Sequence, residues 1–133
     1  MKAVSVVESY YDAFNRKDWA GMLAMLTDDV IHDANQGGRE VGKKAFTAFL
    51  EVMNAHYDER LVDVVVMASA DGRRAAAEFV CQGKYLKTQV GLPEARGQTY
   101  SLPVGAFLTV TKDSKIARVT NYYNLSEWIR QVK

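Results

Sequence analysis

The hydrophobic period of the chain is mainly helical before about residue 60 and that of strands after it, and this change restricts the fold more than any other feature. Before that point, apolar side chains recur at helical spacing over roughly residues 2–16 and 43–57, and over a short stretch that Asp18 can cap. A short extended run, residues 30–35, precedes the third helical stretch. After residue 60, apolar side chains recur at every second position, as in strands. Helices followed by strands predict an α+β domain.

Four extended segments make up most of the second half of the chain. They are predicted at Leu61–Met67, Ala75–Tyr85, Gln98–Thr111 and Ile116–Leu125. Turn residues separate consecutive segments, which indicates antiparallel pairing. We therefore expect a single domain over residues 1–133, with three N-terminal helices packed on one face of a curved antiparallel sheet.

Composition argues against several classes of partner. The net charge is +1 with acids and bases interspersed, so the sequence predicts no surface for nucleic acid or for a membrane. The N-terminal valines within residues 4–7 are followed directly by Glu8, so we expect no secretion signal. The single cysteine, Cys81, cannot form an internal disulfide, which fits a reducing compartment. The chain is therefore expected to be cytoplasmic.

One amide interrupts the apolar face of the last extended segment. At period two, this face carries Ala117, Val119, Asn121, Tyr123 and Leu125. A polar group in such a row needs a hydrogen-bond partner, which can be a protein group, a water or a ligand. Asn121 is therefore a candidate for the lining of a binding pocket.

Five local motifs stand at defined places between these elements. They are Lys17-Asp18-Trp19, residues 28–33 (Asp-Asp-Val-Ile-His-Asp), residues 42–46 (Gly-Lys-Lys-Ala-Phe), the loop at residues 91–97, and residues 115–124. In this order the chain resembles the superfamily of nuclear transport factor 2, ketosteroid isomerase and the SnoaL-like polyketide cyclases, and within it the ketosteroid-isomerase-related proteins. The resemblance implies a cone-shaped sheet, a cystatin-like α+β barrel, with the three helices on its concave face and a cavity between them.

The resemblance also implies positions for acid–base groups in that cavity. In ketosteroid isomerase an aspartate base works against an oxyanion hole of a tyrosine and a protonated aspartate, and these fall on Asp33, Tyr10 and Ala106 here. Alanine cannot donate a hydrogen bond from its side chain, so authentic steroid isomerisation is not expected. In the limonene epoxide hydrolases a water-activating aspartate falls on Asn121. An amide can hold a carbonyl or orient a water there, but it cannot take a proton at neutral pH.

A base must then come from the short extended run, where His32 and Asp33 are the candidates. Adjacent side chains of a strand face opposite sides, so a regular strand cannot point both inward. Counting from Asp28 and Asp29 turns His32 inward, whereas counting back from Gly42, as in the isomerase, turns Asp33 inward. A bulge could reconcile the two counts. We favour Asp33 and keep His32 as the alternative.

The remaining candidate residues are predicted to bind rather than to react. Aromatic and amide side chains expected to contact a ligand are Asn35, Tyr85, Tyr100 and Tyr123. We expect no cofactor, because the chain has no glycine motif that cradles phosphate. We expect no metal ion, because His32 and His56 are far apart and neither has a second ligand three or four residues away.

These residues give a leading functional hypothesis and an alternative. The leading one is a cofactor-independent enzyme of the isomerase, cyclase or lyase kind that acts on an apolar substrate bearing a carbonyl. Asp33 or His32 would move a proton at the α-carbon, while Asn121 and Tyr10 hold the oxygen. The alternative is a non-catalytic module that binds a hydrophobic small ligand or serves for dimerisation.

Assembly is the last expectation. Members of the superfamily commonly pair sheet to sheet, and the predicted outward residues include Phe107, Thr109, Thr120 and Tyr122. Such a surface is apolar and rich in hydroxyl groups rather than charged. We therefore expect a homodimer through the outer face of the sheet.

Overall fold

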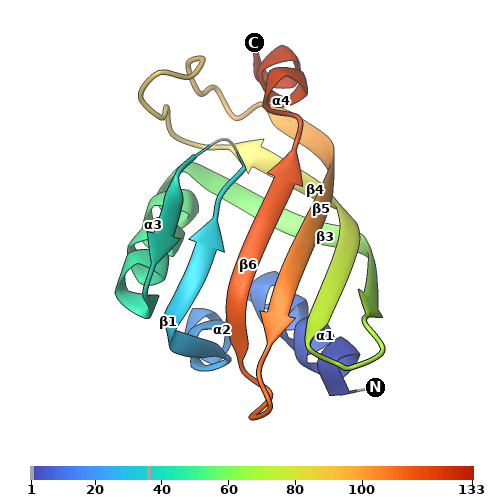
Figure 1. Ribbon diagram of the computed structural model, residues 1–133. Coiled ribbons are helices and arrows are strands. Elements are labelled where there is room, and N and C mark those ends of the chain that lie inside the picture. The colour runs from blue at the N-terminus through green and yellow to red at the C-terminus, as the bar shows by residue number, and fades with distance from the viewer. Residues whose placement is uncertain (1, 36) are drawn as a thin grey trace.

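The computed structural model describes residues 2–35 and 37–133. Its helices and strands follow the chain as α1 (Lys2–Asn15), α2 (Trp19–Ala24), β1 (Leu26–Asp33), β2 (Arg39–Val41), α3 (Lys43–His56), β3 (Tyr57–Ala68), β4 (Arg74–Tyr85), β5 (Thr99–Val110), β6 (Ile116–Tyr123) and α4 (Leu125–Val132). Helices precede most of the strands, so the predicted α+β class is confirmed (Figure 1).

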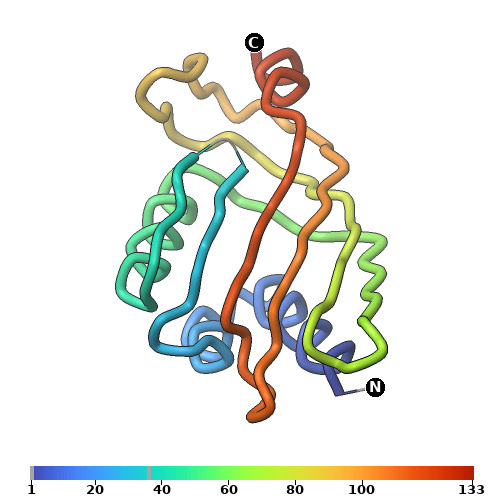
Figure 2. The backbone as a smooth tube through the Cα atoms, in the orientation of Figure 1, coloured from blue at the N-terminus to red at the C-terminus, as the bar shows by residue number. Residues whose placement is uncertain are grey.

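The six strands form one curved, unclosed sheet in the order β2-β1-β6-β5-β4-β3. The sheet bends so strongly that β3, at one edge, crosses behind β5 and β6 in the view of Figure 2. Helices α1 and α2 lie behind the front strands, and α3 flanks β1 and β2 (Figure 1). The helices and the sheet therefore enclose a common interior.

Side chains at alternating positions of the strands fill this interior. In β5 the buried positions are Tyr100, Leu102, Ala106, Leu108 and Val110, as the period-two pattern predicts. The helix α1 buries Ala3, Val7, Tyr10, Tyr11 and Ala13 against the same core. No helix among residues 2–35 and 37–133 is both long and apolar enough to span a bilayer.

Two strand predictions are wrong in detail. The first strand begins at Leu26 rather than near residue 30, and it pairs parallel with β6, so the sheet is not wholly antiparallel. The segment between β1 and α3, which is not predicted to be extended, contains the short strand β2, and β2 pairs antiparallel with β1. The parallel pairing joins segments about ninety residues apart, so no turn marks it in the sequence. The strands β1 and β2 are separated by only five residues, which include Gly37 and Gly38, but β2 is only three residues long and has no alternating pattern to reveal it.

The end of the chain also differs from the prediction. The last strand stops at Tyr123 rather than Leu125, because the Asn124 side chain accepts a hydrogen bond from the Glu127 backbone N–H and caps α4. One face of this helix is buried through Trp128 and Val132. A fourth helix therefore joins the three that were predicted.

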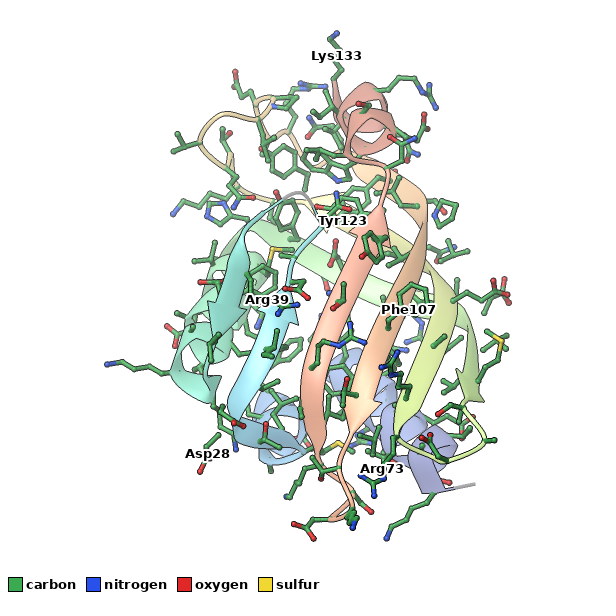
Figure 3. All side chains as sticks on the ribbon, in the orientation of Figure 1. Asp28, Arg39, Arg73, Phe107, Tyr123 and Lys133 are labelled. Carbon is green, nitrogen blue, oxygen red and sulfur yellow. The ribbon has the colours of Figure 1, made fainter. Side chains whose placement is uncertain are left out.

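The outer face of the sheet carries an apolar patch centred on Phe107 and Tyr122 (Figure 3 labels Phe107). These side chains are 49% and 55% exposed, and their rings pack edge to face at 6.0 Å. Val65 and Met67 of β3 are exposed on the same sheet. We propose that two chains pair through this patch, because burial would remove its apolar surface from water.

Pairing predicts that the wild-type protein sediments with the mass of a dimer at micromolar concentration. Charged side chains at the patch centre would be costly to bury, so Phe107→Glu combined with Tyr122→Glu should give the monomer mass. Analytical ultracentrifugation of both proteins measures this. A wild-type protein that sediments as a monomer would refute the pairing.

Candidate active site

A partly enclosed cavity of about 310 Å³ lies between the helices and the sheet. Its wall is mainly aromatic and aliphatic, and its polar or ionisable members include Tyr10, Tyr11, Lys17, His32, Asn35, Glu59, Asn121 and Tyr123. A mostly apolar cavity with a few converging polar groups is the usual form of a small-molecule site.

His32 projects into this cavity from β1. Val30 and His32 are the buried residues near the end of the strand, and His32 is only 2% exposed. Its imidazole packs against the rings of Phe46 and Phe49 of α3, with centroid distances of 4.7 and 4.5 Å. Burial lowers the pKa of His32, although the charges of Glu40 and Asp33 oppose the effect. The imidazole is therefore neutral at pH 7 and can accept a proton.

Asp33 faces the opposite side, so the preference for Asp33 over His32 as the inward residue is wrong. Its carboxylate accepts hydrogen bonds from Arg39 Nε at 2.7 Å, Arg39 Nη2 at 3.0 Å and Thr120 Oγ1 at 2.7 Å. The hydrogen bond from Arg39 is the main cause that lowers the pKa of Asp33 to about 2. Figure 3 labels Arg39 beside β1. On the outer face, this carboxylate therefore links β1 to β2 and β6 through hydrogen bonds and has a structural role.

The count from Asp28 and Asp29 gave the correct orientation of β1. The strand starts at Leu26, and its pairing with β6 shifts register between Leu26 and Ile31. That irregularity lies before His32, so it does not affect a count back from Gly42. The count from Gly42 instead crosses the residues between the end of β1 at Asp33 and the start of β2 at Arg39, where a difference of one residue from the isomerase misplaces the side chains by one position.

Asn121 lines the same cavity as His32, half-buried on β6. The residue opposite it on β5 is the small Ala106, and the residue opposite His32 is Val119, two positions before Asn121. The neighbouring strands β1 and β6 thus bring the imidazole of His32 and the amide of Asn121 to adjacent parts of one cavity wall. The sequence predicts that Asn121 shares the cavity with either Asp33 or His32, and the residue that does so is His32, the alternative.

Tyr10 also lines the cavity, together with its neighbour Tyr11. The two rings meet edge to face at 5.2 Å, and burial raises the pKa of both hydroxyl groups, so both remain protonated donors. Tyr11 had not been proposed as a site residue. Its signal in the sequence was its place beside Tyr10 on the apolar arc of α1.

Three buried polar atoms of the cavity wall have no hydrogen-bond partner among the described residues. They are Tyr11 Oη, His32 Nδ1 and Asn35 Nδ2. The other amide atom of Asn35, Oδ1, accepts a hydrogen bond from the Tyr123 backbone N–H at 2.9 Å. An unsatisfied buried polar group costs about 1–3 kcal/mol, so each of these atoms favours a partner such as a water or a ligand in the cavity.

The four predicted binding residues divide into two groups. Asn35 and Tyr123 line the cavity, whereas Tyr85 and Tyr100 do not. Tyr85 is fully buried, and its hydroxyl donates to the Pro93 carbonyl at 2.7 Å and accepts from the Gln89 N–H at 3.0 Å. It fixes the loop between β4 and β5. Placing Tyr85 and Tyr100 at the ligand was therefore wrong, because their hydroxyl groups bind protein groups.

Glu59, like Tyr11, is a cavity residue that the sequence pattern did not identify. The strand β3 begins at Tyr57 rather than Leu61, so Tyr57, Glu59 and Leu61 share the inward row. Burial raises the pKa of Glu59, although hydrogen bonds from Tyr100 and Cys81 oppose the effect. The signal was available in the alternation of residues 57–61, two positions before the predicted start of the strand.

Among the described residues, no three His, Cys, Asp or Glu side chains converge to hold a metal ion.

Comparisons with known proteins agree with this geometry. A family model described as the SnoaL-like domain matches residues 7–119. No curated protein matches the chain. The crystal structure of a "putative polyketide cyclase" from Xanthomonas campestris pv. campestris is 56% identical, with a TM-score of 0.96, covering 99% of this chain and 97% of that one.

Two further structures extend the comparison. A "putative polyketide cyclase" from Pseudomonas putida KT2440 is 57% identical, with a TM-score of 0.97 and coverage of 100% and 99% of the two chains. TerC, co-crystallised with polyporic acid, is 18% identical with a TM-score of 0.80, covering 99% of this chain and 98% of that one, and shares the fold.

Proposed function

The chain belongs to the SnoaL-like domain family, and from this membership and the chemistry of the cavity we propose that it is a small-molecule enzyme. Its reaction is of the isomerase, cyclase or lyase kind. The substrate is an apolar molecule that bears a carbonyl group and loses a proton from the adjacent carbon. The relatives described as polyketide cyclases support this class of substrate.

The observation that carries the proposal is the group of unpartnered polar atoms on an apolar wall. Tyr11 Oη and His32 Nδ1 are buried in side chains that line the cavity, and neither has a partner among the described residues. Packing alone would favour apolar side chains at both positions, because burying these polar atoms is costly. A ligand that supplies a polar group to each of them removes that cost.

His32 is the proposed base. A neutral imidazole takes the proton from the α-carbon, the C–H bond breaks, and its electron pair forms a carbon–carbon double bond while the carbonyl π pair moves to the oxygen. The Asn121 amide N–H and a hydroxyl of α1, Tyr10 or Tyr11, donate hydrogen bonds to the carbonyl oxygen as negative charge grows there. Phe46 and Phe49 hold the imidazole ring in place and keep it dry.

Hydrogen–deuterium exchange at the α-carbon of 2-tetralone tests the proposal without knowledge of the natural substrate. This bicyclic ketone is apolar, and each α-proton removed in D2O is replaced by deuterium, which proton NMR follows. We expect the protein to raise the exchange rate above that of buffer. Saturable binding of 2-tetralone without faster exchange would favour the alternative, a non-catalytic binding module.

The substitution Asn121→Leu tests whether the Asn121 amide binds the ligand or only stabilises the fold. The row around Asn121 is apolar, so leucine should leave the melting temperature within a few degrees of wild type. Loss of a buried hydrogen bond to the ligand should weaken 2-tetralone binding or its exchange by about 1–3 kcal/mol. Thermal melts and ligand titration on the same variant measure both effects. Lower stability with unaltered affinity would remove Asn121 from the site.

A further inference from the structure

Glu59 is the one carboxylate among the described residues that line the cavity. It stands on the inward row of β3 between Tyr57 and Leu61, both of which are buried. Within the described residues it makes no ion pair, although the positive charge of Lys17, which also lines the cavity, favours its ionised form and the negative charge of Asp58 opposes it. A carboxylate at such a position costs free energy unless it has a use, because an apolar side chain would fill the same space without desolvating a charge.

Three strands are arranged to hold this carboxylate. In the sheet register Glu59 of β3 stands opposite Gly83 of β4, and Gly83 stands opposite Tyr100 of β5. The Tyr100 ring lies over Gly83 and its hydroxyl donates to Glu59 Oε2 at 2.5 Å. A Cβ at position 83 would stand 2.2 Å from Tyr100 Cζ and 2.3 Å from its hydroxyl oxygen. The glycine therefore leaves the gap through which Tyr100 reaches β3.

Glu59 and His32 reach the cavity from different walls. Their strands, β3 and β1, are separated by β6, β5 and β4 in the sheet, and its curvature brings both to one cavity. A ligand that fills the cavity can thus meet an imidazole on one wall and a carboxyl group on another.

We propose that Glu59 is a second catalytic acid–base residue of this cavity, that Tyr100 is its positioning residue, and that the substrate presents an oxygen to Glu59. This rests on the proposed function of His32. As His32 takes the α-proton, the C–H electron pair forms the carbon–carbon double bond, and the carbonyl π pair takes the proton of the Glu59 carboxyl group. The products are an imidazolium, a carboxylate and a neutral enol, so protons and electrons balance. The reverse steps return the ketone.

The pH dependence of 2-tetralone exchange tests the assignment. The reaction requires neutral His32 and protonated Glu59, so the exchange rate should follow a bell-shaped pH profile, which falls at high pH because Glu59 loses its proton. In Glu59→Gln the falling limb should vanish and the maximal rate should drop about 100-fold. Glu78→Gln, on the exposed face of β4, is the matched control and should keep both limbs. A Glu59→Gln variant with wild-type rate and both limbs would overturn the assignment.

Tyr100→Phe tests the positioning role through a readout that packing alone does not move. Phenylalanine keeps the ring over Gly83 but removes the hydrogen bond that favours the ionised form of Glu59. The pKa of Glu59 should rise, and the falling limb should move to higher pH. A limb at its wild-type position would remove Tyr100 from this role.

A second measurement on the wild-type protein keeps this inference separate from the proposed function. The 13C signal of the Glu59 side-chain carboxyl group, assigned by its loss in Glu59→Gln, should shift when 2-tetralone binds. If the wild-type protein does not accelerate exchange, the proposed function fails, and catalysis by Glu59 with it. If exchange is accelerated but the carboxyl signal does not shift, Glu59 makes no ligand contact and only this inference fails.

Discussion

Replacing His32 by glutamine is expected to lower the rate of 2-tetralone exchange by roughly 10²–10⁴-fold, the usual contribution of a positioned proton-transfer group. Glutamine is similar in size and can hydrogen-bond a ligand, but it cannot take a proton at neutral pH. Binding of 2-tetralone should therefore change much less than exchange. The only other histidine, His56, lies outside the cavity wall, and His56→Gln is the matched control.

The same comparison predicts a pH dependence with a defined sign. Burial lowers the pKa of His32 below the ordinary value of 6.5, so the neutral, basic form dominates at pH 7 and is lost in acid. The wild-type rate should rise with pH through a midpoint below 6.5, and this limb should be missing from His32→Gln. A wild-type limb retained in the variant would assign the base to another residue.

Gly83→Ala is expected to give the largest loss of stability. The new Cβ would lie within 2.4 Å of three atoms of the Tyr100 ring and hydroxyl, so the ring must leave its place. Overpacking of this kind costs about 1–3 kcal/mol, and the Glu59 carboxyl group then loses its hydrogen bond at a similar cost. Thermal unfolding should show a melting temperature lower by several degrees.

Gly105→Ala is the matched control, because a Cβ at position 105 meets no atom within 4 Å. A double-mutant cycle identifies the cause: in a Tyr100→Ala background, the cost of Gly83→Ala should shrink. Equal melting temperatures for Gly83→Ala and Gly105→Ala would show that the Tyr100 ring does not lie where the structure has it.

Most of the fold could be predicted because its signals are local. The helices α1 and α3 each keep an apolar arc over fourteen residues, and β4 and β5 alternate without interruption. The parallel pairing of β1 with β6 could not be predicted, since it joins residues about ninety positions apart and no turn marks it. The helix α4 was missed because Asn124, its cap, continues the pattern of the preceding strand.

The candidate site was also predicted only where its signals are local. Asn121 lies between Val119 and Tyr123 in the regular part of β6, so its inward direction followed from the alternation alone. The choice between His32 and Asp33 depended on the number of residues between β1 and β2, where one residue more or less reverses the inward face. Glu59 depended on where β3 begins, and element boundaries are the least certain part of a pattern. The acid–base groups thus sit where local periodicity is weakest.

Intermolecular NOEs between protons of bound 2-tetralone and the aromatic rings of the cavity test the central claim most directly. The account predicts that the ligand contacts the rings of His32 and Tyr11, whose unpartnered polar atoms motivate the site. These contacts should persist in His56→Gln, since His56 lies outside the cavity wall. Ligand NOEs confined to the exposed rings of Phe107 and Tyr122 on the outer sheet face would contradict the account, because they would place the binding surface outside the cavity.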